Sequence, residues 1–413
     1  MITLIDGGVC AAQGFKAAGM HAGIRKNRSK SDLALITSSI AAATAAVYTK
    51  NLVKGAPIAV TKAHLAASHG YANAIICNSG NANTCNPGGE AVAQETCEAL
   101  AQHLGISPNT VVVASTGVIG EPLNPEPILT AIPNLTQRLA ASTTAAHEAA
   151  EAILTTDTHA KEVAVSFELP GPHGPVLCKL GGMAKGSGMI HPDMATMLVF
   201  ITSDVAISPE MLQLALSTDV QRSFNMTSVD GDTSTNDTVA ILANGLAGNT
   251  PIETRGESFA TFMKALNSVT LHLCKMIAGD GEGATKLLEC TVGGAASEAT
   301  AQALAKSVIT SSLVKTAMFG ADANWGRVLC ALGYAGVPLD PFGITVAFES
   351  AAGTITVCEN GVGIGFSEER AKQILLEKEI TIHVQLADGA AQATAWGCDL
   401  TYDYVHINGD YRS

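Results

Sequence analysis

The feature of this chain that most constrains its fold is a glycine-rich loop followed closely by an apolar run. Residues 181–188 read Gly-Gly-Met-Ala-Lys-Gly-Ser-Gly, and residues 194–201 are apolar apart from one threonine. A short apolar run that leaves such a loop is typical of a strand buried on both faces. We therefore expect a central strand that begins beside a flexible loop.

The rest of the chain alternates between strand and helix patterns in two parts. Before residue 290 we expect strands at 32–37, at 110–115 and within 160–205, and helices at 90–104 and 135–154. Beyond residue 290 the pattern changes to amphipathic helices at 297–307 and 367–378, with an alternating strand at 380–386. Since 413 residues favour more than one domain, we predict an α/β domain over 1–287 and a smaller α+β domain over 288–413.

Charge and composition exclude several classes of partner. The net charge of −13 opposes attraction to nucleic acid or anionic lipid, and polar residues interrupt the best apolar candidate for a membrane span, 40–53. The first residues show no export or import signal, and the ten cysteines contain no C-x-x-C pair. We expect a cytoplasmic protein with free thiols that binds neither nucleic acid nor membrane.

The sequence does not match the common cofactor-binding and metal-binding motifs. The glycine spacing of 181–187 fits a phosphate loop, but Ser187 stands where that loop needs lysine. The acidic run at 230–232 lacks the glycine and glutamate of a calcium loop, and no zinc-binding spacing is present. The sequence therefore predicts no metal and no cofactor.

Thr196 carries the chemistry that the glycine-rich segment suggests. It is the first hydroxyl of the apolar run and follows small Ala195, so it could attack the preceding carbonyl, and hydrolysis of the resulting ester would cut the chain between these residues. The freed α-amine, with a reference pKa of about 7.7, could then act as general base for the same hydroxyl. From local sequence alone, a plain β-branched residue opening a strand remains the alternative.

The segment around Thr196 resembles the self-cleavage and nucleophile motif of the ornithine acetyltransferases. The resemblance extends along the whole chain, through Asn-Ser-Gly-Asn-Ala-Asn at 78–83, Ser-Thr-Gly-Val-Ile-Gly at 115–120, Thr-Thr-Asp-Thr at 155–158, 225–237, Gly-Asp-Gly-Glu-Gly at 279–283, Asp-Ala-Asn-Trp-Gly-Arg at 322–327 and 408–413. It implies a self-processing α/β sandwich of the N-terminal-nucleophile type with a smaller α+β C-terminal domain. It also implies transfer of acetyl from N2-acetylornithine to glutamate through an acetyl-Thr196 ester, with acetyl-CoA as a second donor left open.

The same resemblance assigns roles to individual residues. Thr196 is the nucleophile, cleavage falls between Ala195 and Thr196, and Thr116 and Gly117 form the oxyanion hole. The implied substrate contacts are Thr155, Lys185, Thr196, Glu282, Asn408 and Ser413. Thr156 and Thr158 remain alternatives to Thr155 as the substrate contact. The C-terminus is expected to fold back into the site, and the two cleaved chains to assemble as an α2β2 heterotetramer.

Two other functions remain as alternatives. An N-terminal-nucleophile aminopeptidase or amidase would share the self-cleavage and the acyl-enzyme but pass the acyl group to water. A small-molecule binding protein on the same scaffold would leave the threonine motif unused and the chain uncut. Taken singly, Lys185 is also compatible with a solvated loop lysine and Glu282 with a turn carboxylate.

Overall fold

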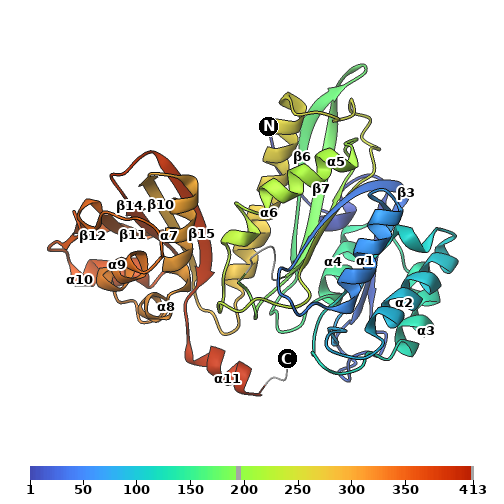
Figure 1. Cartoon of the computed structure of the whole chain (residues 1–413), viewed down its shortest axis with the longest axis horizontal. Coiled ribbons are helices and arrows are strands. Elements are labelled where there is room, and N and C mark those ends of the chain that lie inside the picture. The colour runs from blue at the N-terminus through green and yellow to red at the C-terminus, as the bar shows by residue number, and fades with distance from the viewer. Residues whose placement is uncertain (192–196, 411–413) are drawn as a thin grey trace.

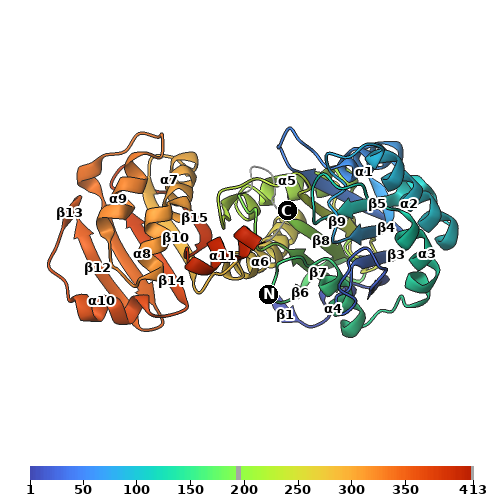
Figure 2. The same ribbon diagram turned by 90° about the horizontal axis from the view of Figure 1, so that it is seen from below.

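The computed structural model describes residues 1–191 and 197–410, and it divides them into two lobes, each built on one sheet. Figure 1 shows the lobes side by side, with the last helix, α11 (Tyr402–Asp410), extending from the smaller lobe toward the larger one. In Figure 2, α11 lies between the lobes beside α6 (Glu257–Gly279). Residues 402–410 are thus carried back toward the larger lobe.

The larger lobe contains a nine-stranded sheet of order β1-β6-β7-β8-β9-β3-β4-β5, with β2 paired beside β3. The β4–β5 and β8–β9 pairs are parallel and the others are antiparallel. The strands are β1 (Thr3–Ile5), β2 (Phe15–Met20), β3 (Leu33–Tyr48), β4 (Tyr71–Asn78), β5 (Val111–Ser115), β6 (Lys161–Gly171), β7 (Gly174–Lys185), β8 (Leu198–Ser203) and β9 (Thr238–Ala243). The helices of this lobe besides α6 are α1 (Ala56–Ala67), α2 (Gly89–Leu104), α3 (Glu126–Gln137), α4 (Thr143–Ala152) and α5 (Pro209–Asp219).

The long strand β3 joins two halves of this sheet. Its first residues pair with β4 and its last residues with β9, and the register shifts between Thr37 and Ala42, where residues 39–41 are exposed. Side-chain alternation places a buried cluster on each face of each half. On β8, Ile201 packs in the cluster with α5 and α6, whereas Phe200 shares a second cluster with Ile75 of β4; Ile76 faces α2 and α3. Two strand layers therefore lie between helical layers, and the predicted α/β sandwich is confirmed.

Local patterns predicted several of these elements and failed at two. Residues 181–185, predicted as part of a flexible loop, belong to strand β7, where they pair with β6 and β8. Strand β5 and helix α2 lie where the sequence places them, but the predicted helix at 135–154 is wrong. The chain leaves α3 after Gln137, Ala140 forms a bridge with Ala17 of β2, and Ser142 caps a new helix, α4, by accepting a bond from the Ala145 N–H. A backbone partner far away in sequence interrupts the alanine-rich run.

The smaller lobe is a six-stranded sheet of order β13-β12-β11-β14-β10-β15, with helices packed against it. Its strands are β10 (Leu287–Ala295), β11 (Thr345–Ser350), β12 (Gly353–Glu359), β13 (Val362–Gly363), β14 (Glu379–Gln385) and β15 (Ala391–Cys398). Its helices are α7 (Glu298–Thr310), α8 (Ser312–Phe319), α9 (Trp325–Gly333) and α10 (Glu368–Leu375). Strand β10 begins at the last residue of the predicted first domain.

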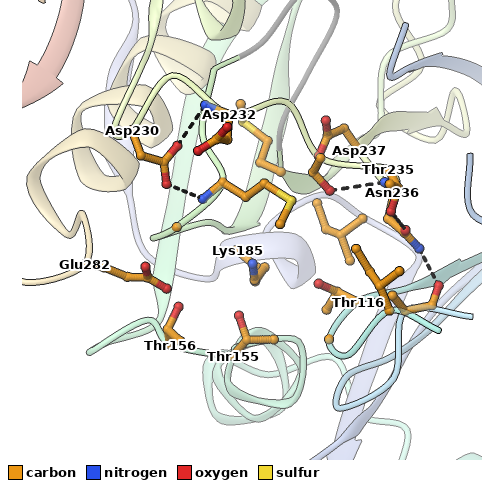
Figure 3. A pocket seen from close by; sticks show the side chains of 18 of the residues that line it. Thr116, Thr155, Thr156, Lys185, Asp230, Asp232, Thr235, Asn236, Asp237 and Glu282 are labelled. Atoms are coloured by element: carbon orange, nitrogen blue, oxygen red, sulfur yellow. Dashed lines mark hydrogen bonds between the residues drawn. The ribbon is translucent and has the colours of Figure 1, made fainter. Parts of the chain in front are cut away.

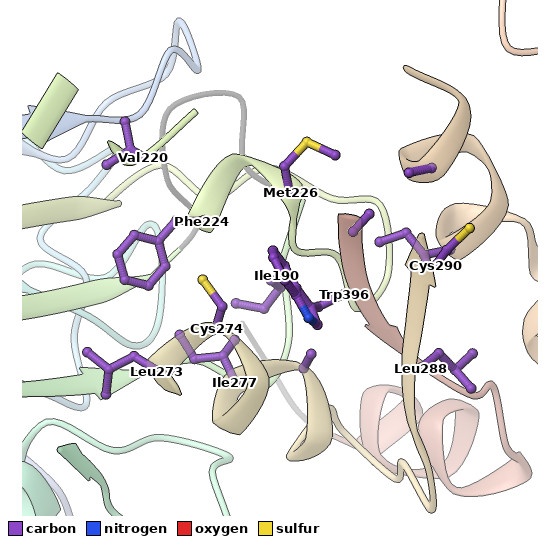
Figure 4. Close-up of a cluster of buried hydrophobic side chains, with 14 of the residues drawn as sticks. Ile190, Val220, Phe224, Met226, Leu273, Cys274, Ile277, Leu288, Cys290 and Trp396 are labelled. Atoms are coloured by element: carbon purple, nitrogen blue, oxygen red, sulfur yellow. The ribbon is translucent and has the colours of Figure 1, made fainter. Parts of the chain in front are cut away.

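One apolar core runs through the junction of the lobes. Ile190 and Ile277 of the larger lobe belong to the same buried cluster as Cys290 and Trp396 of the smaller lobe (Figure 4). The Ser228 N–H also donates to the Trp396 carbonyl across the junction. The division at residue 287 as two separate domains stays a prediction. None of the helices in the described ranges is long and apolar enough to cross a bilayer.

Candidate active site

One cavity, called the main cavity below because several of the predicted site residues line it, lies where strands β5, β7, β8 and β9 end or begin. It has a volume of about 440 Å³, and Tyr404 and Asn408 of α11 form part of its wall. The predicted residues on its wall are Thr116, Gly117, Thr155, Lys185, Glu282 and Asn408. Ala195, Thr196 and Ser413 lie outside the described residues. Met197, which follows Thr196 in the chain, lines the cavity.

Strand pairing fixes Lys185 beside the start of β8. Lys185 ends β7 and is the antiparallel partner of Leu198, and the Thr238 N–H donates to the Met197 carbonyl at 2.9 Å. The start of β8 is therefore held on both sides, by β7 and by β9. Among the residues that the structure describes, none forms an ion pair with Lys185, whose ammonium lies in the middle of the cavity (Figure 3).

A tight turn after β5 presents two hydrogen-bond donors to the cavity. The Thr116 N–H is already used, since it donates to the Asn78 carbonyl at 3.0 Å, which leaves the threonine hydroxyl and the Gly117 N–H. Gly117 has φ +130°, and a Cβ there would lie 2.4 Å from the Gly80 carbonyl carbon. Only glycine fits this turn, because the neighbouring backbone approaches so closely. A hydroxyl and an amide side by side on a cavity wall are the kind of donors that can stabilise an oxyanion.

A buried carboxylate orders the side of the cavity that carries Thr155. Asp157 accepts bonds from the Thr155 N–H at 3.0 Å, from the Gly186 N–H at 2.7 Å and from Lys161 Nζ at 2.7 Å. Burial acts to raise the pKa of Asp157, but the charges of Lys161 and Lys185 outweigh it and hold the pKa at about 2. Thr155 and Thr156 both line the cavity, and Thr158 does not.

Glu282 and Asn408 meet across the lobes. The Asn408 amide donates to Glu282 Oε2 at 2.7 Å, and Glu282 is only 8% exposed. A Cβ at Gly188 would lie 2.4 Å from that carboxylate, so the glycine-rich loop gives Glu282 its space. Helix α11 is held further by the Thr401 hydroxyl, which donates to the Gly283 carbonyl at 2.6 Å.

Three aspartates on the wall had no role in the sequence-based prediction. In Figure 3, Asp230, Asp232 and Asp237 lie across Lys185 from Thr155. Asp230 accepts the N–H groups of residues 189 and 190, and its burial raises its pKa. Asp237 is 2% exposed, one of its oxygens has no partner, and burial raises its pKa well above the usual value. All three aspartates lie in the 225–237 segment that carries part of the family resemblance, but the residue types alone do not assign them a role.

The described wall therefore combines one cation, several carboxylates and hydroxyls, and two free donors. This suits a small zwitterion, whose carboxylate Lys185 can bind and whose ammonium Glu282 can bind. No histidine is present among the wall residues that the structure describes.

Comparisons with known proteins agree with one another. The model of the ArgJ family matches residues 16–413. The arginine biosynthesis bifunctional protein ArgJ 1 of Clostridium acetobutylicum is 48% identical over 97% of this chain and 96% of its own length. The arginine biosynthesis bifunctional protein ArgJ of Symbiobacterium thermophilum is 48% identical over 99% of each chain. A crystal structure of arginine biosynthesis bifunctional protein ArgJ from Bacillus halodurans is 47% identical with a TM-score of 0.50, covering 52% of this chain and 100% of the solved one.

Proposed function

Since this chain belongs to the ArgJ family, we propose that it is an acetyltransferase of arginine biosynthesis that moves acetyl from N2-acetylornithine to glutamate. The products are ornithine and N-acetylglutamate. The relatives are named bifunctional, which supports a second activity, and we assign it to acetylation of glutamate by acetyl-CoA. Acetyl-CoA is a co-substrate in this scheme, and the exchange needs no metal or cofactor.

The observation that carries the proposal is the convergence of the motif residues on one cavity. Thr116, Thr155, Lys185, Glu282 and Asn408 come from separate segments spread over almost 300 positions, yet all line one wall. If these residues were unrelated turn residues and solvent-exposed side chains, they would not be expected to line the same cavity.

The first half-reaction transfers acetyl to the protein. The Thr196 hydroxyl attacks the acetyl carbonyl of N2-acetylornithine, and its proton passes to the α-amine of the same residue. The Thr116 hydroxyl and the Gly117 N–H stabilise the oxyanion. The C–N bond then breaks, ornithine leaves with the transferred proton on its amine, and an acetyl ester remains on Thr196.

The second half-reaction reverses these steps with glutamate. Its amine attacks the ester carbonyl, the threonine oxygen leaves and regains a proton, and N-acetylglutamate is released. Lys185 binds a carboxylate in both half-reactions, because both substrates are amino acids. In this ping-pong order the two substrates use the same site in turn.

Self-cleavage between Ala195 and Thr196 supplies the free α-amine. The matched Bacillus halodurans chain corresponds over its full length to about half of this chain, as one product of such a cut would. We further propose that the two products assemble as an α2β2 heterotetramer. The ten cysteines are all free, which supports a reducing compartment such as the cytoplasm.

Intact-mass spectrometry tests the proposal directly. We expect two chains beginning at Met1 and Thr196, and the second should gain one acetyl group with N2-acetylornithine and lose it when glutamate is added. Thr196→Ala should remain full-length and unacetylated, whereas Thr218→Ala, an exposed change on α5, should behave as wild type.

Each alternative gives a different result in the same experiment. Rapid loss of the acetyl group to water without glutamate would favour the aminopeptidase or amidase. A single uncut chain that never gains acetyl would contradict the acetyltransferase and favour a binding protein.

A further inference from the structure

A buried ion-pair cluster lies directly behind the cavity wall. Lys161, the first residue of β6, is 0% exposed, and its ammonium lies 2.7 Å from Asp157 Oδ1 and 2.6 Å from Asp280 Oδ2. Both carboxylates are buried as well. None of the three lines the cavity, so they do not touch a bound substrate. We call Asp157, Lys161 and Asp280 the buried triad.

The Asp157 arm of the triad fixes two wall segments. One oxygen accepts the Thr155 N–H, and the other accepts the Gly186 N–H, next to Lys185. The Lys185 backbone and the Thr155 loop are thus bound to the same carboxylate. Movement of Asp157 would displace both.

The Asp280 arm fixes the segment that carries Glu282. Its carboxylate accepts the Thr158 N–H at 3.0 Å and the Thr158 hydroxyl, and its carbonyl accepts the Ser187 hydroxyl at 2.7 Å. The Glu282 N–H in turn donates to the Ser187 carbonyl at 3.1 Å. The positions of Lys185 and Glu282 therefore both depend on the bonds that Lys161 makes.

The charge of the triad adds an electrostatic link to Lys185. Two carboxylates face one ammonium, and the charge of Lys185 is one of the influences that keep Asp157 ionised. The excess negative charge of the triad attracts the Lys185 ammonium in return. Replacing Lys161 would leave two buried carboxylates without their partner, which destabilises a fold strongly.

We propose that Lys161, with Asp157 and Asp280, is a positioning residue that sets the separation of Lys185 and Glu282 to match an amino-acid substrate. The inference rests on the proposed function, since it takes an amino acid as the ligand of this wall. An amino acid holds its carboxylate and ammonium at a fixed spacing, so a shift of either binding group weakens affinity. The chemical step, which uses other groups, is affected less.

Asp280→Asn is the variant that tests this role without leaving an unpaired charge. The triad then holds one carboxylate and one ammonium, while the shape of the side chain is kept. We expect the Kd for ornithine, measured by titration calorimetry, to rise about tenfold, the effect of one lost charge-assisted hydrogen bond. The limiting rate of acetyl-enzyme formation at saturating N2-acetylornithine should change by less than about twofold, since substrate positioning is recovered at saturation.

Asp219→Asn is the matched control. Asp219 is a buried carboxylate on α5 that accepts bonds from Ser223 and Asn267 and does not line the main cavity. A purely structural role predicts that both variants lower the thermal midpoint and leave the Kd unchanged. Lys161→Met, the more severe change, should raise the Kd further if it folds.

The outcomes separate this inference from the proposed function. Wild-type Kd in folded Asp280→Asn would overturn the positioning role, as would a Kd increase of equal size in Asp219→Asn. Ornithine binding without any acetyl-enzyme in the wild type would refute the proposed function, and the effect on Kd would still decide the role of the triad. Failure of the wild type to bind ornithine would overturn both.

Discussion

Replacing Asn408 by aspartate tests whether α11 completes the site. The Asn408 amide donates to a Glu282 oxygen at 2.7 Å, and this bond crosses from one lobe to the other. Asn408→Asp keeps the size of the side chain but replaces the donor with a second carboxylate. The contact then changes from attraction to repulsion.

The magnitude follows from the distance. Two unit charges 2.7 Å apart repel by about 1.5 kcal/mol at the dielectric of water and about 6 kcal/mol at an effective dielectric of 20. Asn408 is exposed and Glu282 is buried, and the aspartate can rotate toward solvent, so the effect lies near the lower limit. With the hydrogen bond also lost, we expect about 2 kcal/mol, which corresponds to about a thirtyfold change in an equilibrium constant.

Two measurements report this change. The Kd for ornithine, from calorimetry, should rise by up to about thirtyfold, and amide exchange in α11 should become faster because the helix is released. Val405→Asp is the matched control: it adds the same charge to the same helix at a side chain that is 71% exposed. It should leave the Kd within about twofold of wild type, as surface changes usually do.

Equal Kd values for Asn408→Asp and Val405→Asp would refute the reasoning, because the effect would then be one of charge on α11 in general. An unchanged Kd with faster exchange in α11 would show that docking of the helix and binding of ornithine are independent. Only a specific loss of affinity supports a site completed by the C-terminal helix.

Three other changes test separate parts of the structure. Gly117→Ala should reduce both the urea midpoint and acetyl transfer, since its Cβ collides with backbone, while Gly120→Ala, also at positive φ but in open space, should cost only the strain of about 1–2 kcal/mol. The free energy of unfolding of Asp237→Asn should increase relative to that of wild type as the pH rises from 5 to 8. The reason is that the buried carboxyl, whose pKa is raised, favours folding only while it is protonated, and an equal difference at both pH values would contradict this. In the native protein, iodoacetamide should label Cys85 and Cys330 first, as the exposed thiols, and early labelling of the seven buried thiols would show that their burial is wrong.

The sequence predicts which residues line the cavity better than it predicts the contacts that hold them in place. Strand β5 and helix α2 follow from local periodicity, and the nucleophile motif points to the end of β7. The failure at 135–154 has a tertiary cause, because Ala140 pairs with Ala17 across more than 100 residues. Periodicity within an alanine-rich run contains no information about such a partner.

The buried triad illustrates the same limit. Lys161 begins a β-rich segment, where a lysine is usually solvent-exposed, and its partner Asp280 lies 119 residues further along the chain. The resemblance supplied the residues that line the wall but not those that hold it. Asp230 was visible in the sequence, and only its packing against the glycine-rich loop shows that its role is to bind backbone N–H groups.

The order of strands explains how the protein can be cut and remain one body. The proposed cut falls between β7 and β8, so β8 and β9 would belong to the second chain. In the sheet these two strands lie between β7 on one side and β3 on the other, both from the first chain. After such a cut, the second chain would be held by two ladders, β7–β8 and β3–β9, each of six residue pairs. The first chain would supply Lys185, and the second would supply Glu282 and Asn408, so neither chain would contain the site alone. The two ladders that would keep the cut protein together also hold these two parts of the site in register.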